Sequence, residues 1–288
     1  MSEDPVVSAV LTATVGIVGL VGLVLVMAPP SVRAVEAWLF GLGLASDDPP
    51  VAAVRGVLVR MSYVGTVVFA IATAVAVLAD FKMSSAALGL ATAGALSPLV
   101  SAGGGRHRRV ALAAPTGRDS VAVVSMIAGV VVGVGSMVLV AILEAEQRFR
   151  REEGAGAIVL DSGSALPAIE SYTLPVLGVV AFLLSATMAM GALRIRRRQA
   201  LAAVDGSIDH ALRAAQLHRL SFSVLGGQVV VAGLVCVGLP LIGGTGDIER
   251  MAAFATPLSL SLVAIGLALI AYSHLLPFWI ARARASRQ

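Results

Sequence analysis

Long runs of apolar residues separated by short polar connections are the dominant pattern of this chain. Seven runs reach or approach the roughly 20 residues that a helix needs to cross the hydrocarbon core of a membrane. They cover residues 6–28, 57–79, 84–101, 121–143, 174–193, 220–242 and 258–280. The runs lack the polar–apolar alternation of membrane β-strands, and helices satisfy their own backbone hydrogen bonds in lipid. We therefore expect an all-α polytopic bundle of seven transmembrane helices, forming one domain over residues 1–288.

The connection between the first two runs contains a shorter amphipathic segment. Ser31 stands at the position of a helix N-cap, and the apolar residues that follow it have helical spacing. Because the segment near 32–45 is too short to span, we expect an amphipathic helix that lies in the membrane interface. Trp38 then lies at the depth of the lipid headgroups. A short re-entrant helix is the alternative.

Composition agrees with a membrane protein and excludes other classes. Hydrophobic residues make up 58% of the chain and charged residues only 13%, against about 25% in an ordinary soluble domain. The mean hydropathy of +0.92 is incompatible with a disordered chain. A single cysteine, Cys236, excludes a disulfide scaffold.

The basic residues predict the orientation of the chain. Of 21 arginines and lysines, 16 lie on the side that holds the connections after the first, third and fifth runs and the C-terminal tail. Since positive charge is enriched on the cytoplasmic side, we expect an external N-terminus, a cytoplasmic C-terminus and a location in the cell membrane. The acidic leader and long first run are unlike a cleaved signal, so we expect this run to be retained.

Three arginine clusters account for much of this asymmetry. This distribution explains the pI near 10, so we expect no nucleic-acid partner. Two clusters flank the third and fifth runs, where arginine can bind anionic lipid headgroups; simple anchoring of the topology is the alternative. The residues of these two clusters are Arg106, Arg108, Arg109, Arg194, Arg196, Arg197 and Arg198.

Small residues and helix breakers predict features of packing inside the membrane. Ser125, Gly129 and Gly133 recur every four residues, which favours close helix contacts within the chain; an interface with a second copy is the alternative. Two interruptions are predicted inside runs, one at Ser97-Pro98 and one at Gly226-Gly227-Gln228. We expect most of the other prolines within or beside the runs to start or end helices.

Two histidines are the residues that suggest a cofactor. His218 and His274 lie near the same end of the last two runs, where adjacent helices would bring them to one depth. Paired imidazoles can hold haem or a metal ion. No third ligand has a suitable spacing, so we expect His274 to be a hydrogen-bonded packing residue and the protein to have no cofactor.

One short motif resembles a catalytic signature. Gly244-Thr245-Gly246-Asp247 is similar to the Gly-x-Gly-Asp motif of intramembrane aspartyl peptidases, the presenilin and prepilin peptidase group. That resemblance implies a dyad of Asp247 with Asp80, which the predicted topology places at the same face. One carboxyl would activate water while the other stays protonated. The chain departs from the group at Glu249, where those enzymes often carry a basic residue, and it lacks the presenilin Pro-Ala-Leu segment.

These observations leave three functional hypotheses. We expect a multi-pass protein that acts as a membrane-embedded interaction or assembly component. The apolar runs carry no acidic residue well inside them, which argues against a carboxylate proton relay. A transporter or channel subunit for a small solute is the first alternative, and the aspartyl peptidase is the second.

Overall fold

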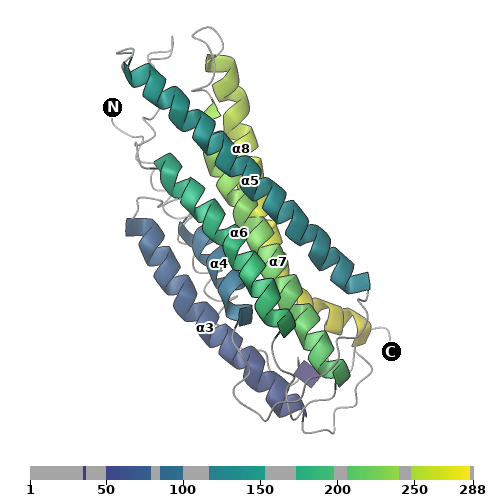
Figure 1. Cartoon of the computed structure of the whole chain (residues 1–288). Helices are drawn as coiled ribbons and strands as arrows, with labels where there is room; N and C mark the ends of the chain where they lie inside the picture. Colours follow the sequence, from purple (N-terminus) through teal and green to yellow (C-terminus); the bar gives the residue numbers. More distant parts are fainter. Residues whose placement is uncertain are drawn as a thin grey trace, which may run out of the picture.

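The described part of the chain is a bundle of helices. The structure, a computed structural model, describes residues 35–36, 50–78, 85–99, 117–152, 173–197, 206–239 and 248–285. Its elements are α3 (Pro50–Leu78), α4 (Ser85–Leu96), the 3₁₀ helix η1 (Ser97–Leu99), α5 (Gly117–Glu152), α6 (Thr173–Arg197), α7 (Gly206–Cys236) and α8 (Ile248–Ala285). Figure 1 shows them side by side in one elongated bundle. We call one end of the bundle the arginine end, because it holds Arg55 and Arg60 of α3 and Arg194, Arg196 and Arg197 of α6. There α3 begins, α6 ends and α7 begins, whereas α5 ends and α8 begins at the opposite end.

Five of these helices are long and apolar enough to cross a membrane, namely α3, α5, α6, α7 and α8. They confirm the helical nature of five predicted runs. All five begin before their runs, and α5, α6 and α8 also continue past them, whereas α3 ends at Leu78 and α7 at Cys236, before the predicted ends at 79 and 242. The first run, 6–28, lies outside the described residues. Within the predicted interfacial helix the structure describes only Val35 and Glu36, both helical.

The predicted interruption at Ser97-Pro98 is confirmed and shortens the third run. The helix α4 has 12 residues, about 18 Å at 1.5 Å per residue, against a hydrocarbon core of about 30 Å. It ends in η1, where Pro98 has no N–H to donate and its ring opposes helical geometry in the preceding residue. Ser97 and Pro98 are both buried, so this helix end lies inside the bundle.

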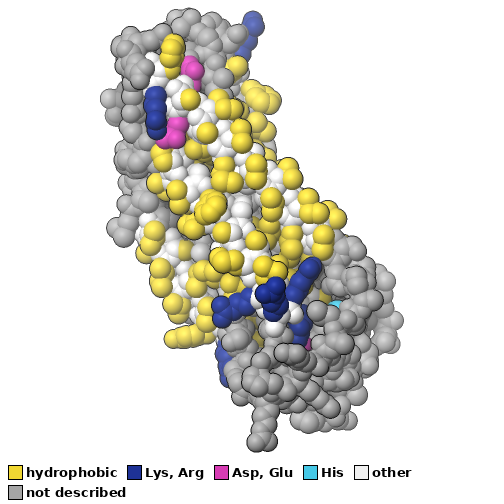
Figure 2. Space-filling model, in the orientation of Figure 1, with side chains coloured by type: hydrophobic (Ala, Val, Ile, Leu, Met, Phe, Trp, Pro, Cys, Tyr) yellow, Lys and Arg dark blue, Asp and Glu magenta, His cyan; other side chains and the backbone are white. Residues whose placement is uncertain are grey.

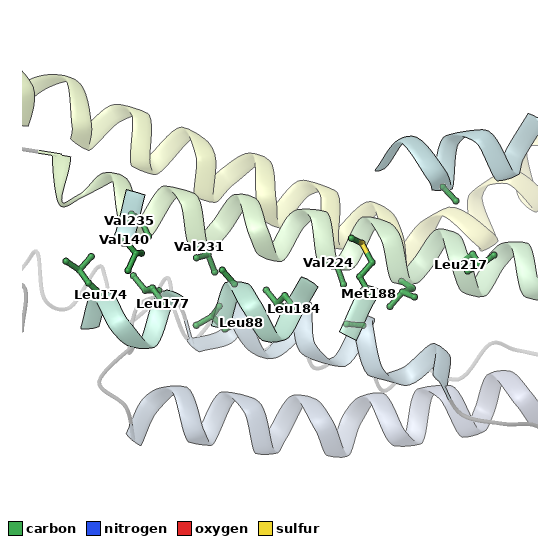
Figure 3. Close-up of a cluster of buried hydrophobic side chains, with 14 of the residues drawn as sticks. Leu88, Val140, Leu174, Leu177, Leu184, Met188, Leu217, Val224, Val231 and Val235 are labelled. Carbon is green, nitrogen blue, oxygen red and sulfur yellow. The ribbon is translucent and has the colours of Figure 1, made fainter. Parts of the chain in front are cut away.

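The helix α7 lies at the centre of the bundle. In its most apolar stretch 72% of the residues are buried, against 22–28% for the four other long helices. It packs against α4, α5, α6 and α8, while α3 packs mainly on α4. Figure 3 shows Val224 and Val231 of α7 beside Leu177, Leu184 and Met188 of α6 in the main apolar cluster.

The outer faces of the long helices are apolar. Figure 2 shows a belt of hydrophobic side chains between the arginine end and the charged residues of the opposite end. Such an exterior suits lipid, because lipid tails are as apolar as these side chains. The exposed residues include Tyr63, Ile71, Val124, Ile127, Val131, Phe182, Leu183 and Leu260.

The predicted interruption at Gly226-Gly227-Gln228 is wrong, because α7 is a continuous helix through it. Each residue instead faces a different neighbour. A Cβ on Gly226 would lie 2.6 Å from the carbonyl oxygen of Gly266 in α8, and one on Gly227 would lie 2.7 Å from Ala91 Cβ in α4. The glycines therefore allow close approach of neighbouring helices to the central one.

The small residues of α5 pack within the chain, as predicted. A Cβ on Gly129 would lie 3.5 Å from Met188 of α6, and one on Gly133 would lie 2.7 Å from Gln228 of α7. Ser125 is buried on the same face. This face of α5 is therefore already occupied by α6 and α7.

The expectation that prolines start or end helices is correct for Pro175 and wrong for Pro257 and Pro277. Pro175 lies in the first turn of α6, where its missing N–H removes no helical hydrogen bond. Pro257 and Pro277 lie inside α8, which continues to Ala285. Neighbouring helices and local adjustments allow proline inside transmembrane helices, so the residue alone does not place a helix end.

Candidate functional site

Buried polar side chains gather on α7, the helix least exposed to the surroundings. We call the set the α7 polar seam. Buried polar groups cost free energy unless they are hydrogen-bonded, and inside membrane bundles they often mark functional positions. The seam consists of Asp209, Arg213, Gln216, Ser221, Ser223 and Gln228.

At the arginine end the seam begins with a buried ion pair. Arg213 Nε donates to Asp209 Oδ2 at 2.7 Å, and their side chains are only 10% and 4% exposed. Arg213 Nη1 also donates to the carbonyl oxygen of Arg196 at 3.1 Å, in the last turn of α6. Such terminal carbonyls lack partners within their own helix. The pair thus joins the end of α6 to the start of α7.

Sequence reasoning missed this pair because it assigned residues 194–219 to a connection. A signal was present, since opposite charges four residues apart face one another on a helix. Asp209 also lies in the first turn of α7, where the helix dipole favours a negative charge. Hydropathy excluded this turn from the predicted apolar run 220–242, because the turn is charged.

One turn further along, Gln216 is buried with little hydrogen bonding. Its side chain is 1% exposed. Among the described residues, Nε2 donates only to the thioether sulfur of Met61 in α3, at 3.7 Å, and this sulfur is a weak acceptor. Its Oε1 has no partner among the described residues, and neither has the hydroxyl of fully buried Ser97. The element that holds Ser97, η1, packs against both α3 and α7, the helices that carry Met61 and Gln216.

Gln228 forms a second polar position, deeper in the bundle. Its Nε2 donates to the carbonyl oxygen of Ala181 at 2.8 Å and to Ser185 Oγ at 2.9 Å, both in α6. Since Ser185 donates its own proton to Ala181 O, both neighbours are acceptors and fix the orientation of the amide. The opposite atom, Oε1, is buried and has no partner in the described part of the chain.

The histidine region is an aromatic contact between α7 and α8. The His218 ring lies 4.4 Å from Phe222 and 5.8 Å from Tyr272, measured between ring centroids. Ser223 and Ser273 share a hydrogen bond of 2.7 Å. The two helices therefore pack together beside His218, but the side chain of His274 lies outside the described residues, so the pairing of the two histidines stays a prediction. Among the described side chains, no group of three or more His, Cys, Asp and Glu is arranged to hold a metal ion.

Several other predicted positions fall outside the described residues. Asp80 and Asp247 are among them, so the aspartyl dyad stays a prediction. The same holds for the cluster at 106–109 and for Arg198. By contrast, Arg194, Arg196 and Arg197 are described and exposed at the end of α6.

The fold and seam define an all-helical bundle with five helices of membrane-spanning length and a polar central helix. Comparisons with protein-family models, curated protein sequences and solved structures found no match.

Proposed function

We propose that the protein is a membrane-embedded subunit of the transporter or channel class that binds a small polar solute between α3, η1 and α7. The main observation that supports this proposal is the fully buried amide of Gln216, whose Oε1 has no partner among the described residues. Leaving a buried acceptor unpaired costs about 1–3 kcal/mol, so such a group favours binding of a donor.

The short helix α4 supports the same proposal. Many transporters bind their solutes where a helix is interrupted near the centre of the membrane, because the interruption frees backbone and side-chain polar groups. Here α4 ends at buried Ser97, whose hydroxyl has no partner in the described residues, in an element that packs against α3 and α7.

The chemistry of the unpaired atoms selects the solute class. Gln216 Oε1 can only accept a hydrogen bond, and the hydroxyl of Ser97 can accept one as well. The solute is therefore a small molecule that donates hydrogen bonds, such as a polyol, urea or water.

We expect Gln216→Leu to slow solute flux. Purified protein is reconstituted into phosphatidylcholine vesicles, and re-swelling after a shock with glycerol or urea, or water efflux, is followed by light scattering. Wild-type vesicles exchange at least one probe faster than protein-free vesicles. In the variant, the flux above the protein-free level falls roughly tenfold, since one lost hydrogen bond of about 1–1.5 kcal/mol corresponds to that factor.

Gln147→Leu is the matched control, because it makes the same change in the part of α5 near the opposite end of the bundle. It leaves the flux unchanged. Wild-type fluxes of all three probes equal to those of protein-free vesicles would overturn the proposal, as would equal losses in the two variants.

A second candidate is the membrane-embedded assembly component expected from the sequence. It is favoured by the bonds of Gln228 to α6 and of Ser223 to Ser273, which hold the helices together as a rigid support would require. Under this candidate, the vesicle experiment yields no flux above the protein-free level.

We further propose that the chain crosses the cell membrane seven times, the third time through the whole run 84–101, of which α4 is only a part, with an external N-terminus, a cytoplasmic C-terminus and an interfacial helix near 32–45. The shared position of Arg55, Arg60 and the α6 arginines at one end of the bundle supports this orientation.

Cysteine labelling tests the orientation in intact cells. In a Cys236→Ser background, Ser162→Cys reacts with a membrane-impermeant maleimide added outside, because it lies in a connection predicted to be external. Ala202→Cys reacts only after the cells are opened. The reverse pattern would contradict the proposed orientation.

A further inference from the structure

We infer that the exposed arginines at the arginine end bind the phosphate headgroups of anionic phospholipids. We call this set the arginine rim. It consists of Arg55 and Arg60 of α3 and Arg194, Arg196 and Arg197 of α6, all of them exposed. This inference is independent of solute transport.

Contacts to one turn of α7 bring the two halves of the rim to the same level. Arg213 holds the carbonyl oxygen of Arg196, which places the end of α6 beside this turn. The neighbouring residue, Leu212, packs with Val57 and Met61 of α3. In the sequence Val57 lies between Arg55 and Arg60, and Met61 directly follows Arg60. Figure 2 shows arginine side chains, in dark blue, gathered below the hydrophobic belt at this end.

The rim directly borders the apolar belt. Val59 precedes Arg60 on α3, and Leu193 precedes Arg194 on α6; both apolar side chains are exposed. A ligand that reaches these guanidinium groups therefore lies at the boundary between apolar and polar surroundings, where lipid phosphates are found. Arginine suits this ligand because its planar fork donates two parallel hydrogen bonds to a phosphate.

The buried carboxylate that the structure describes at this level is already paired inside the bundle. The buried carboxylate at this level, Asp209, is bound by Arg213, which is not part of the rim. The exposed guanidinium groups thus keep a net positive field at this end, which an anionic lipid lowers and a zwitterionic lipid does not.

Lipid binding is measured on the full chain in detergent by native mass spectrometry, titrated with phosphatidylglycerol or phosphatidylcholine. Wild type binds phosphatidylglycerol more tightly. We expect Arg55→Gln/Arg60→Gln to lower that affinity roughly 30-fold, since each basic residue near an anionic membrane surface contributes about fivefold. The control, Arg148→Gln/Arg250→Gln, removes the same charge near the opposite end of the bundle and leaves the affinity unchanged.

Three results would overturn the inference. These are equal affinity for the two lipids, equal losses in the rim and control variants, and displacement of phosphatidylglycerol by inorganic phosphate at the same concentration. The last result would identify a site for the free anion. The α6 variant Arg194→Gln/Arg197→Gln provides a second test of the rim, and circular dichroism confirms that each variant is folded.

Discussion

Gly226→Ala will destabilise the protein although it adds a single methyl group. The new Cβ lies 2.6 Å from the carbonyl oxygen of Gly266 and 3.1 Å from the backbone nitrogen of Ile270. These are backbone atoms, so the backbones of α7 and α8 must shift apart at this contact. We expect a loss of about 1–3 kcal/mol in the free energy of unfolding, typical of overpacking, and a larger loss for Gly226→Leu.

Unfolding in mixed detergent micelles, followed by circular dichroism, measures this effect. Gly135→Ala is the matched control, because a Cβ at that position of α5 meets nothing within 4 Å. We expect it to leave the unfolding midpoint unchanged. If Gly135→Ala and Gly226→Ala shifted the midpoint equally, the loss would come from replacing glycine within a helix and not from the α7–α8 contact.

Arg213→Met will destabilise the protein more strongly. It removes the guanidinium partner of Asp209 and the donor to the carbonyl oxygen of Arg196 while roughly keeping the length of the side chain. Breaking a buried ion pair on one side costs about 3–5 kcal/mol, because the other charge stays buried. The measurement is the same unfolding transition in detergent.

Two further variants separate the buried charge from other causes. Arg148→Met removes the partner of Glu144 in an exposed pair with an N–O distance of 3.9 Å, where we expect a loss of at most about 0.5 kcal/mol. Asp209→Leu/Arg213→Met removes both charges and recovers most of the stability. If the double variant were as unstable as Arg213→Met, the ion pair would not be the cause.

The candidate site was only partly visible in the sequence. The interruption at Ser97-Pro98 was predicted because the loss of an N–H at proline is a local property. Gln216 was not singled out, because an amide beside a charged turn is usually solvated, and its burial depends on the surrounding helices, with Met61 of α3 among its contacts. His218 was predicted to lie at the depth of His274, and in the described structure its ring packs against Phe222 and Tyr272.

The sequence by itself determined the helical class and the positions of five long apolar helices. Run length and hydropathy are local quantities, and the hydrocarbon core sets the length that a spanning helix needs. Only the tertiary structure decided that α7 is central, that Gly226 and Gly227 serve close packing, and that Asp209 and Arg213 are buried together. Burial depends on which helices surround a residue, and hydropathy along one chain carries no information about those neighbours.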